Sequence, residues 1–207
     1  MTSISISYAE MERHLLQDRQ PSLYFNNICK LRAFALYPFS MLLELQETPQ
    51  SAQYHPEGNV WNHTMLVVDE AAKVRDKSCD ARVFMWAALL HDIGKPGTTR
   101  IRGSKVTAYD HEKLGAELAR KFLLALTDDS AFMERVAVLI RWHMQILFVV
   151  KGLPFAEIET MGREADINEI ALLGLCDRLG RTNSNRTLEE KNIEIFVSKC
   201  GHRPTKI

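Results

Sequence analysis

The segment ARVFMWAALLHDIGKPG occupies residues 81–97 and says most about how the chain folds. Residues 81–91 are strongly apolar at helical spacing, so they predict a buried helix. Two glycines and a proline follow within residues 94–97 and predict that this helix ends before them. His91 and Asp92 are therefore expected at the end of an apolar helix, where two polar side chains need partners.

Most of the other segments also have helical period. Helices are predicted over residues 8–19, 26–47 (divided at Pro38), 62–75, 112–126, 130–144, 155–161, 166–179 and 187–199. The last three begin with typical first-turn residues, which are Pro154, the pair Asp166 and Glu169, and the pair Thr187 and Glu190. Residues 98–110 predict a loop with a small hairpin around residues 102–104. Strand patterns are nearly absent elsewhere, so the expected fold class is all-α, a compact helical bundle forming a single domain over residues 1–207.

The composition excludes several classes of protein. With 46% hydrophobic and 25% charged residues, the chain is neither wholly disordered nor fibrous. Its 26 basic and 26 acidic residues give no net charge, so an extensive nucleic-acid surface is not expected. The four cysteines lie far apart and predict free thiols in a reducing compartment. Neither a signal peptide nor a membrane span is evident, so we expect a cytoplasmic protein without membrane contact, whose oligomeric state is left open.

Several polar side chains lie on apolar faces of different predicted helices. They are His63, His91, His111, His143 and Asp177, and Asp92 adjoins His91. Each shares its face with apolar residues at steps of three, four or seven. Buried carboxylates need compensation, and no inward lysine or arginine matches them. A metal ion would neutralise the carboxylates and use the imidazole lone pairs. The alternative is that each histidine is an ordinary core residue with its own hydrogen bond.

The string LLHDIGKP at residues 89–96 resembles the signature of the HD-domain superfamily of metal-dependent phosphohydrolases, of the HDIG type. Further elements follow in that family's order, namely WNHT at 61–64, DHEKLGA at 110–116, RWH at 141–143 and LCDRLGR at 175–181. The runs HPEGNVWNHT, GKPGTT and HEKLGA are most similar to the HD domain of bacterial CCA-adding tRNA nucleotidyltransferases. The nucleotidyltransferase head of those enzymes has no counterpart here, and Asp110 replaces a frequent glycine. The resemblance therefore extends to the HD site and not to the polymerising activity.

The resemblance implies a division of the chain and a set of metal ligands. An N-terminal helical cover is expected over residues 1–50, an HD metal-binding core over 55–181 and a C-terminal helix over 187–200. Two divalent ions are implied. The first is held by His63, His91, Asp92 and Asp177, and the second by His111 and His143, with Asp92 bridging the two. The mixed nitrogen and oxygen donors without a thiolate suit Mn, Fe, Co, Ni or Zn and do not choose among them.

The implied activity is phosphate-ester hydrolysis. Two ions about 3.5–4 Å apart can share a bridging hydroxide and clamp the oxygens of a phosphoryl group. We therefore expect a phosphohydrolase that uses this hydroxide to cleave a phosphomonoester or phosphodiester in a small nucleotide-like substrate, for example a 2′,3′-cyclic phosphate. Asp92 and Lys95 are expected to be catalytic, and Lys95, Arg178 and Arg181 to bind the substrate. The alternative for these basic residues is exposed or helix-capping charge.

Two other functions stay open from the sequence. A di-iron oxygenase of the HD type, acting on a small alcohol or phosphonate, resembles this six-ligand set and would consume O₂. A non-catalytic regulatory module would keep the metal cage and bind metal or nucleotide without forming product. The roles of two residues near the predicted ligands, Glu112 and His55, also stay open. Glu112 is expected as a favourable charge in a first helical turn, or else as an acceptor for a ligand imidazole. His55 is expected either in the pocket wall or in an ordinary loop.

Overall fold

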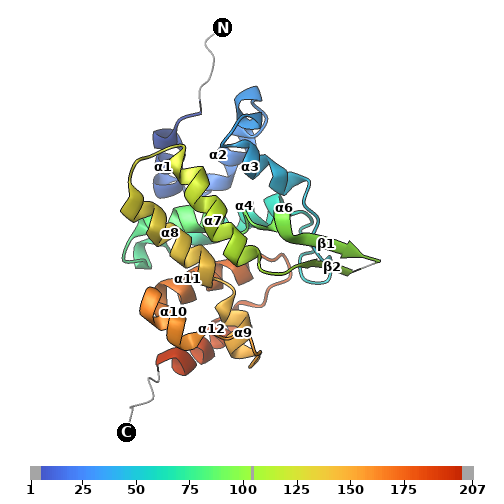
Figure 1. Cartoon of the computed structure of the whole chain (residues 1–207), viewed down its shortest axis with the longest axis vertical. Coiled ribbons are helices and arrows are strands. Elements are labelled where there is room, and N and C mark those ends of the chain that lie inside the picture. Colours follow the sequence, from blue (N-terminus) through green and yellow to red (C-terminus); the bar gives the residue numbers. More distant parts are fainter. Residues whose placement is uncertain (1–5, 104, 202–207) are drawn as a thin grey trace.

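Helix α5 (Ala81–Leu90) lies at the centre of the core, and every residue from Val83 to Leu90 is buried. The computed structural model describes residues 6–103 and 105–201. Asp80 caps α5 by accepting a hydrogen bond from the Val83 amide. Helices α4 (Val60–Ala72), α8 (Ser130–Trp142) and α11 (Ile167–Leu179) pack around α5, and α7 (His111–Leu124) packs along α8 (Figure 1). The predicted apolar helix and its end before residue 94 are confirmed.

The N-terminal part covers one end of this bundle (Figure 1). Helix α1 (Tyr8–Gln17) packs on α5, and α2 (Pro21–Ile28) packs on α4. The prediction of two helices over residues 26–47 is wrong. Helix α2 begins earlier because Pro21 lies in its first turn, where its missing amide hydrogen costs nothing. Residues 31–47 then form only short turns, which are two 3-10 helices (Arg32–Ala35 and Glu44–Gln46) and α3 (Ser40–Leu43), since Leu31 and Leu36 are extended.

A short hairpin projects from the helices between α5 and α7 (Figure 1). After α5 the chain makes one helical turn, α6 (Lys95–Thr98), which the sequence did not predict. A proline is tolerated in the first turn of a helix, so Pro96 does not prevent this turn. Strands β1 (Thr99–Arg102) and β2 (Lys105–Ala108) are antiparallel, with Thr99 opposite Ala108 and Arg102 opposite Lys105. The predicted hairpin is confirmed. Apart from this hairpin, the regular elements within the described ranges are helical, so the all-α fold class is confirmed.

The C-terminal part contains α9 (Gln145–Val150), α10 (Ile158–Glu164), α11 and α12 (Arg186–Gly201). In the central part of the chain, a 3-10 turn at Arg75–Lys77 joins α4 to α5. The helix predicted over 155–161 is displaced to α10, and Pro154 lies in the preceding turn. Asp166 caps α11 as predicted.

Two other predicted helix starts are corrected. Glu169 does not complete the cap of α11 and instead accepts hydrogen bonds from Ser78 Oγ and the Cys79 amide. Thr187 does not cap α12, because the helix begins at Arg186 and the side chain of Asn185, two residues before Thr187, accepts a hydrogen bond from the Leu188 amide. In the part of the chain that the structure describes, no helix has the length and apolar character needed to cross a membrane.

Candidate metal centre

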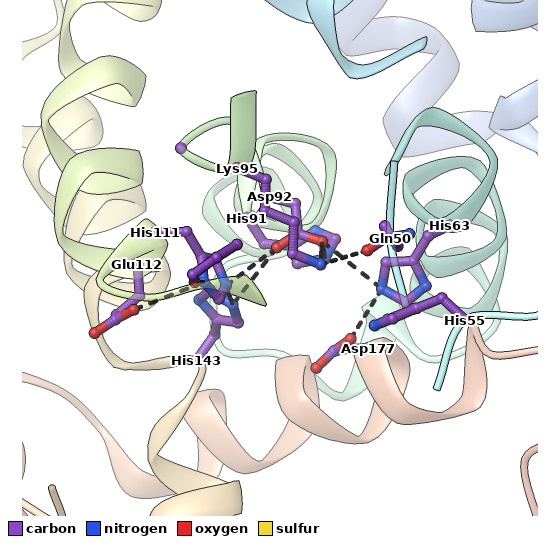
Figure 2. Close-up of polar contacts among 12 residues, drawn as sticks. Gln50, His55, His63, His91, Asp92, Lys95, His111, Glu112, His143 and Asp177 are labelled. Carbon is purple, nitrogen blue, oxygen red and sulfur yellow. Dashed lines mark hydrogen bonds and ion pairs between the residues drawn. The ribbon is translucent and has the colours of Figure 1, made fainter. Parts of the chain in front are cut away.

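All six predicted ligands meet at one place inside the bundle (Figure 2). All six are buried, and five helices position them: His63 lies in α4, His91 and Asp92 directly follow α5, His111 begins α7, His143 follows α8, and Asp177 lies in α11. Gly94 brings two of these elements together. A Cβ atom at Gly94 would overlap the carbonyl oxygen of His111, so only glycine lets the chain after Asp92 lie this close to α7.

Asp92 is the centre of the arrangement, because its two oxygens face two different pairs of imidazoles. Oδ2 lies 3.2 Å from His91 Nε2 and 3.9 Å from His63 Nε2. Oδ1 lies 3.3 Å from His111 Nε2 and 3.9 Å from His143 Nε2. Both resulting triads have ligand atoms within 4.8 Å of one another, as a bound ion would require.

Asp177 extends the first triad. Its Oδ1 lies 3.0 Å from His63 Nε2. Burial raises the pKa of Asp177, but Arg181 and His63 outweigh it and hold the pKa well below its ordinary value. Burial likewise raises the pKa of Asp92, and His91 and Lys95 lower it well below its ordinary value. Both carboxylates are therefore ionised at neutral pH and can act as metal ligands.

The imidazole rings are oriented by backbone carbonyl groups. The Nδ1 atoms of His91, His111 and His143 lie 2.9, 2.7 and 2.7 Å from the carbonyl oxygens of the residues three positions earlier, Ala88, Ala108 and Ile140. A carbonyl oxygen only accepts, so each Nδ1 carries the hydrogen. In the neutral ring Nε2 then presents its lone pair to the centre, which is the form that binds a metal ion.

Several imidazole nitrogen atoms at this centre have no hydrogen-bond donor to pair with, so the set of ligand atoms suits bound divalent ions. His111 Nε2 and His143 Nε2 lie 3.3 Å apart, so two lone pairs face each other when both rings are neutral. Burial and the neighbouring His111 and His91 lower the pKa of His143 to about 3, so that ring is neutral at pH 7. His91 Nε2 is buried without a hydrogen-bond partner. Burial lowers the pKa of His91, but the adjacent Asp92 outweighs burial and raises it. A cation between these atoms would use lone pairs that otherwise have no donor.

Lys95 supplies the one ammonium group in direct contact with Asp92 among the described residues. Its Nζ lies 2.6 Å from Asp92 Oδ2 and 2.6 Å from Gln50 Oε1. The contact with Asp92 is an ion pair, since Oδ2 has no well-aligned hydrogen bond. Lys95 therefore lies at the centre. The expectation that no inward lysine or arginine compensates the buried carboxylates is wrong, because Lys95 faces Asp92 and Arg181 faces Asp177.

The two predicted substrate arginines have different environments. Arg178 is buried, and its Nη1 donates to Glu189 Oε2 at 3.0 Å. Arg181 Nη2 lies 3.6 Å from Asp177 Oδ2, and its Nε is buried without a hydrogen-bond partner. Of the two, Arg181 has more donor capacity left for a ligand.

Glu57 is a residue of this centre that the sequence analysis missed. Its Oε1 lies 2.9 Å from His63 Nδ1 and 2.8 Å from His55 Nδ1. Its Oε2 accepts a hydrogen bond from the Thr182 amide at 3.4 Å. Burial raises the pKa of Glu57, but its hydrogen bonds with His63, its own backbone amide and His55 lower the pKa to about 2. Glu57 thus orients a ligand ring, the arrangement by which a second carboxylate strengthens a metal-binding histidine. Because Glu57 lies in a loop, helical period could not reveal it.

Glu112 does not serve a ligand ring in this way. Its Oε2 lies 3.9 Å from His111 Nδ1, which donates to the Ala108 carbonyl instead. Glu112 thus lies where the sequence analysis preferred it, as a charge in the first turn of α7.

His55 lines a cavity of about 1000 Å³ whose wall also includes Asp92, His111, His143 and Asp177. The centre is therefore open to a molecule of moderate size.

The family model described as the HD domain matches residues 60–181, which include all six ligands. The chain belongs to the HD-domain family. The predicted family membership is thereby confirmed, and HD domains form a superfamily of metal-dependent phosphohydrolases that bind divalent metal ions.

Curated relatives of this HD domain include several proteins named "Multifunctional CCA protein". The one from Mannheimia succiniciproducens is 26% identical over 179 residues, which cover 83% of this chain and 42% of that protein. The one from Azoarcus sp. is 42% identical over 156 residues, covering 75% of this chain and 34% of that protein. The one from Halorhodospira halophila is 38% identical over 96 residues, covering 46% and 22%. The chain thus spans less than half the length of these relatives.

Proposed function

We propose that the chain is a metal-dependent phosphohydrolase that cleaves a phosphomonoester or phosphodiester in a small, nucleotide-like molecule. The observation that carries this proposal is the carboxylate of Asp92, whose two oxygens each face a different pair of imidazoles in the wall of an open cavity. The family membership supports hydrolysis. The resemblance to the HD domain of CCA-adding enzymes supports a nucleotide-like substrate.

The proposed cofactors are two divalent transition-metal ions, of Mn, Fe, Co, Ni or Zn. One would be held by His63, His91, Asp92 and Asp177, and the other by Asp92, His111 and His143. When bound, such ions supply Lewis-acid polarisation of the phosphoryl group and a water nucleophile at neutral pH. Asp92 is essential in this proposal because it belongs to both ligand sets.

The basic side chains of the cavity wall would bind the phosphoryl group. Lys95 has three N–H donors and two partners, Asp92 and Gln50, so one donor is left for a phosphate oxygen. Arg181 lines the same cavity and has an Nε without a hydrogen-bond partner, which supports a role in binding a second oxygen. Arg178 is the weaker candidate because Glu189 already accepts from its guanidinium.

The experiment is a substrate and metal panel on metal-free protein. The substrates are p-nitrophenyl phosphate, bis-p-nitrophenyl phosphate, nucleoside monophosphates and 2′,3′-cyclic AMP, each with Mn, Fe, Co, Ni, Zn or Mg. We expect hydrolysis of at least one ester with a transition metal, loss of activity with a chelator, and recovery when the metal is restored. Absence of product with every metal would contradict the proposal. O₂ consumption with iron would then favour the oxygenase, and nucleotide binding without product would favour the regulatory module.

A further inference from the structure

One wall of the cavity is mostly apolar and begins directly after the ligand His143. It consists of α9 and the turn that follows, residues 151–157. The apolar residues of this wall that line the cavity are Leu147, Phe148, Leu153, Pro154 and Phe155, and Met144 precedes them. Lys151 and Glu157 of the same segment also line the cavity. An apolar wall beside a polar metal centre divides the cavity into two chemically different halves.

This wall is held in place by a buried glutamine. Gln145 Oε1 accepts a hydrogen bond from the Glu157 amide at 2.9 Å, and its Nε2 donates to the Phe155 carbonyl at 3.2 Å. The Leu153 amide donates to the Phe148 carbonyl at 2.8 Å. Gly152 makes the turn with φ +62°, a conformation that favours glycine. The turn is therefore folded back on α9 and preformed before any ligand binds.

Exposed aromatic side chains gather around this cavity. Phe155 is 60% exposed, Tyr109 72% and Tyr54 57%, and all three line the cavity. The Phe155 and Phe148 rings form a T-shaped pair with centroids 5.7 Å apart, and more than half of the Phe155 side chain stays exposed. Exposed apolar surface that clusters in a cavity indicates a ligand site, whereas scattered exposed residues do not.

We propose that α9 and residues 151–157 form a subsite for a planar aromatic group of the phosphate ester, with Phe155 as a specificity-determining residue. The inference rests on the proposed function, since it places the phosphoryl group at the metal centre of the same cavity. A planar ring can stack on the exposed part of the Phe155 ring, and such stacking tolerates any base or aryl group. A purely polar organic group, such as a sugar, would leave the apolar wall uncovered.

The test compares two esters that share a phosphate and differ in the aromatic group. Adenosine 5′-monophosphate and ribose 5-phosphate form one pair, and phenyl phosphate distinguishes an aryl group from a nucleobase. The variants are Phe155→Ala and Phe155→Leu, with Leu124→Ala as a matched control, because Leu124 is also exposed and does not line the cavity. Truncation at Phe155 removes a mostly exposed ring, so the core is retained.

We expect Phe155→Ala to raise KM for the aromatic esters roughly tenfold, with kcat changed less than about twofold and ribose 5-phosphate unaffected. Phe155→Leu keeps an apolar side chain and is expected to lose nearly as much. Any of three results would overturn the aromatic subsite. Phe155→Ala could change KM equally for both esters of a pair, it could keep the full preference for aromatic esters, or Phe155→Leu could have the wild-type KM.

A second readout separates this proposal from the proposed function. Binding of adenosine, which carries no phosphate, is measured by chemical-shift titration of the metal-free protein. We expect shifts in residues 145–157 of the wild type and of Leu124→Ala, and their loss in Phe155→Ala. If no ester is hydrolysed but adenosine binds in this way, the subsite stands and the hydrolase proposal fails. If hydrolysis occurs and adenosine gives no shifts there, the subsite fails alone.

Discussion

Replacing Asp92 with asparagine is expected to abolish metal-dependent phosphate-ester hydrolysis, lowering kcat/KM by about a thousandfold or more. The amide keeps the shape of the side chain but removes the charge from the group that faces both pairs of imidazoles. Loss of an interaction of several kcal/mol in both ligand sets accounts for this magnitude. The measurement is kcat/KM at saturating metal on the best ester of the panel.

The matched control for this change is Asp128→Asn. Asp128 is exposed and remote from the centre in the fold, so activity is expected to stay at the wild-type level. Circular dichroism shows whether each variant keeps its helices. A folded Asp92→Asn protein with activity within about tenfold of the wild type would place the reaction elsewhere in the molecule.

Addition of a divalent transition metal to the chelator-treated protein is expected to raise the melting temperature by about 5–10 °C for each ion bound, and therefore by about 10–20 °C when both sites are filled. Binding at a hundred times Kd stabilises the folded state by about 2.7 kcal/mol per site, and for a domain of this size each kcal/mol raises Tm by about 2–4 °C. The physical reason is that the folded chain holds the imidazole nitrogens, including the unpartnered His91 Nε2, and the ionised carboxylates together, whereas the unfolded chain does not. Differential scanning fluorimetry with Mn, Co, Ni or Zn measures the shift.

Two variants serve as controls for the metal-induced shift. Glu57→Gln keeps all six ligands but weakens the acceptor of His63 Nδ1, so its titration is expected to need roughly 10–100 times more metal. Asp92→Asn is expected to lose most of the shift. An equal shift in the wild type and in Asp92→Asn would show that metal binds outside this centre.

The helices and ligands that could be predicted from the sequence share one physical property. Helices α7 and α8 have an apolar face repeated over more than three turns, so both their existence and their buried side follow from the spacing. Helix α5 is apolar almost throughout, which indicates burial on all sides. His63, His143 and Asp177 lie on such faces and were found because a polar residue there must point inward. The proposed division into residues 1–50, 55–181 and 187–200 stays a prediction.

The features that the sequence did not predict depend on contacts between distant segments. Glu57 reaches His63 and Thr182 from a loop, and Gln145 fixes the turn that presents Phe155, so no local period marks either residue. Residues 31–47 are apolar enough for a longer helix, but the chain forms short turns there whose apolar side chains join the core of the bundle. Gly94 was read as a helix stop, and its second role, the close approach to α7, depends on a contact across the fold.

The two-ion centre is tested most directly by an anomalous difference map from a crystal grown with Mn, Co, Ni or Zn. We predict two peaks about 3.5–4 Å apart on either side of Asp92. One peak should be ligated by His63, His91 and Asp177, and the other by His111 and His143. A map of well-ordered protein with no peak among these side chains, or with the ions bound only elsewhere, would contradict the account.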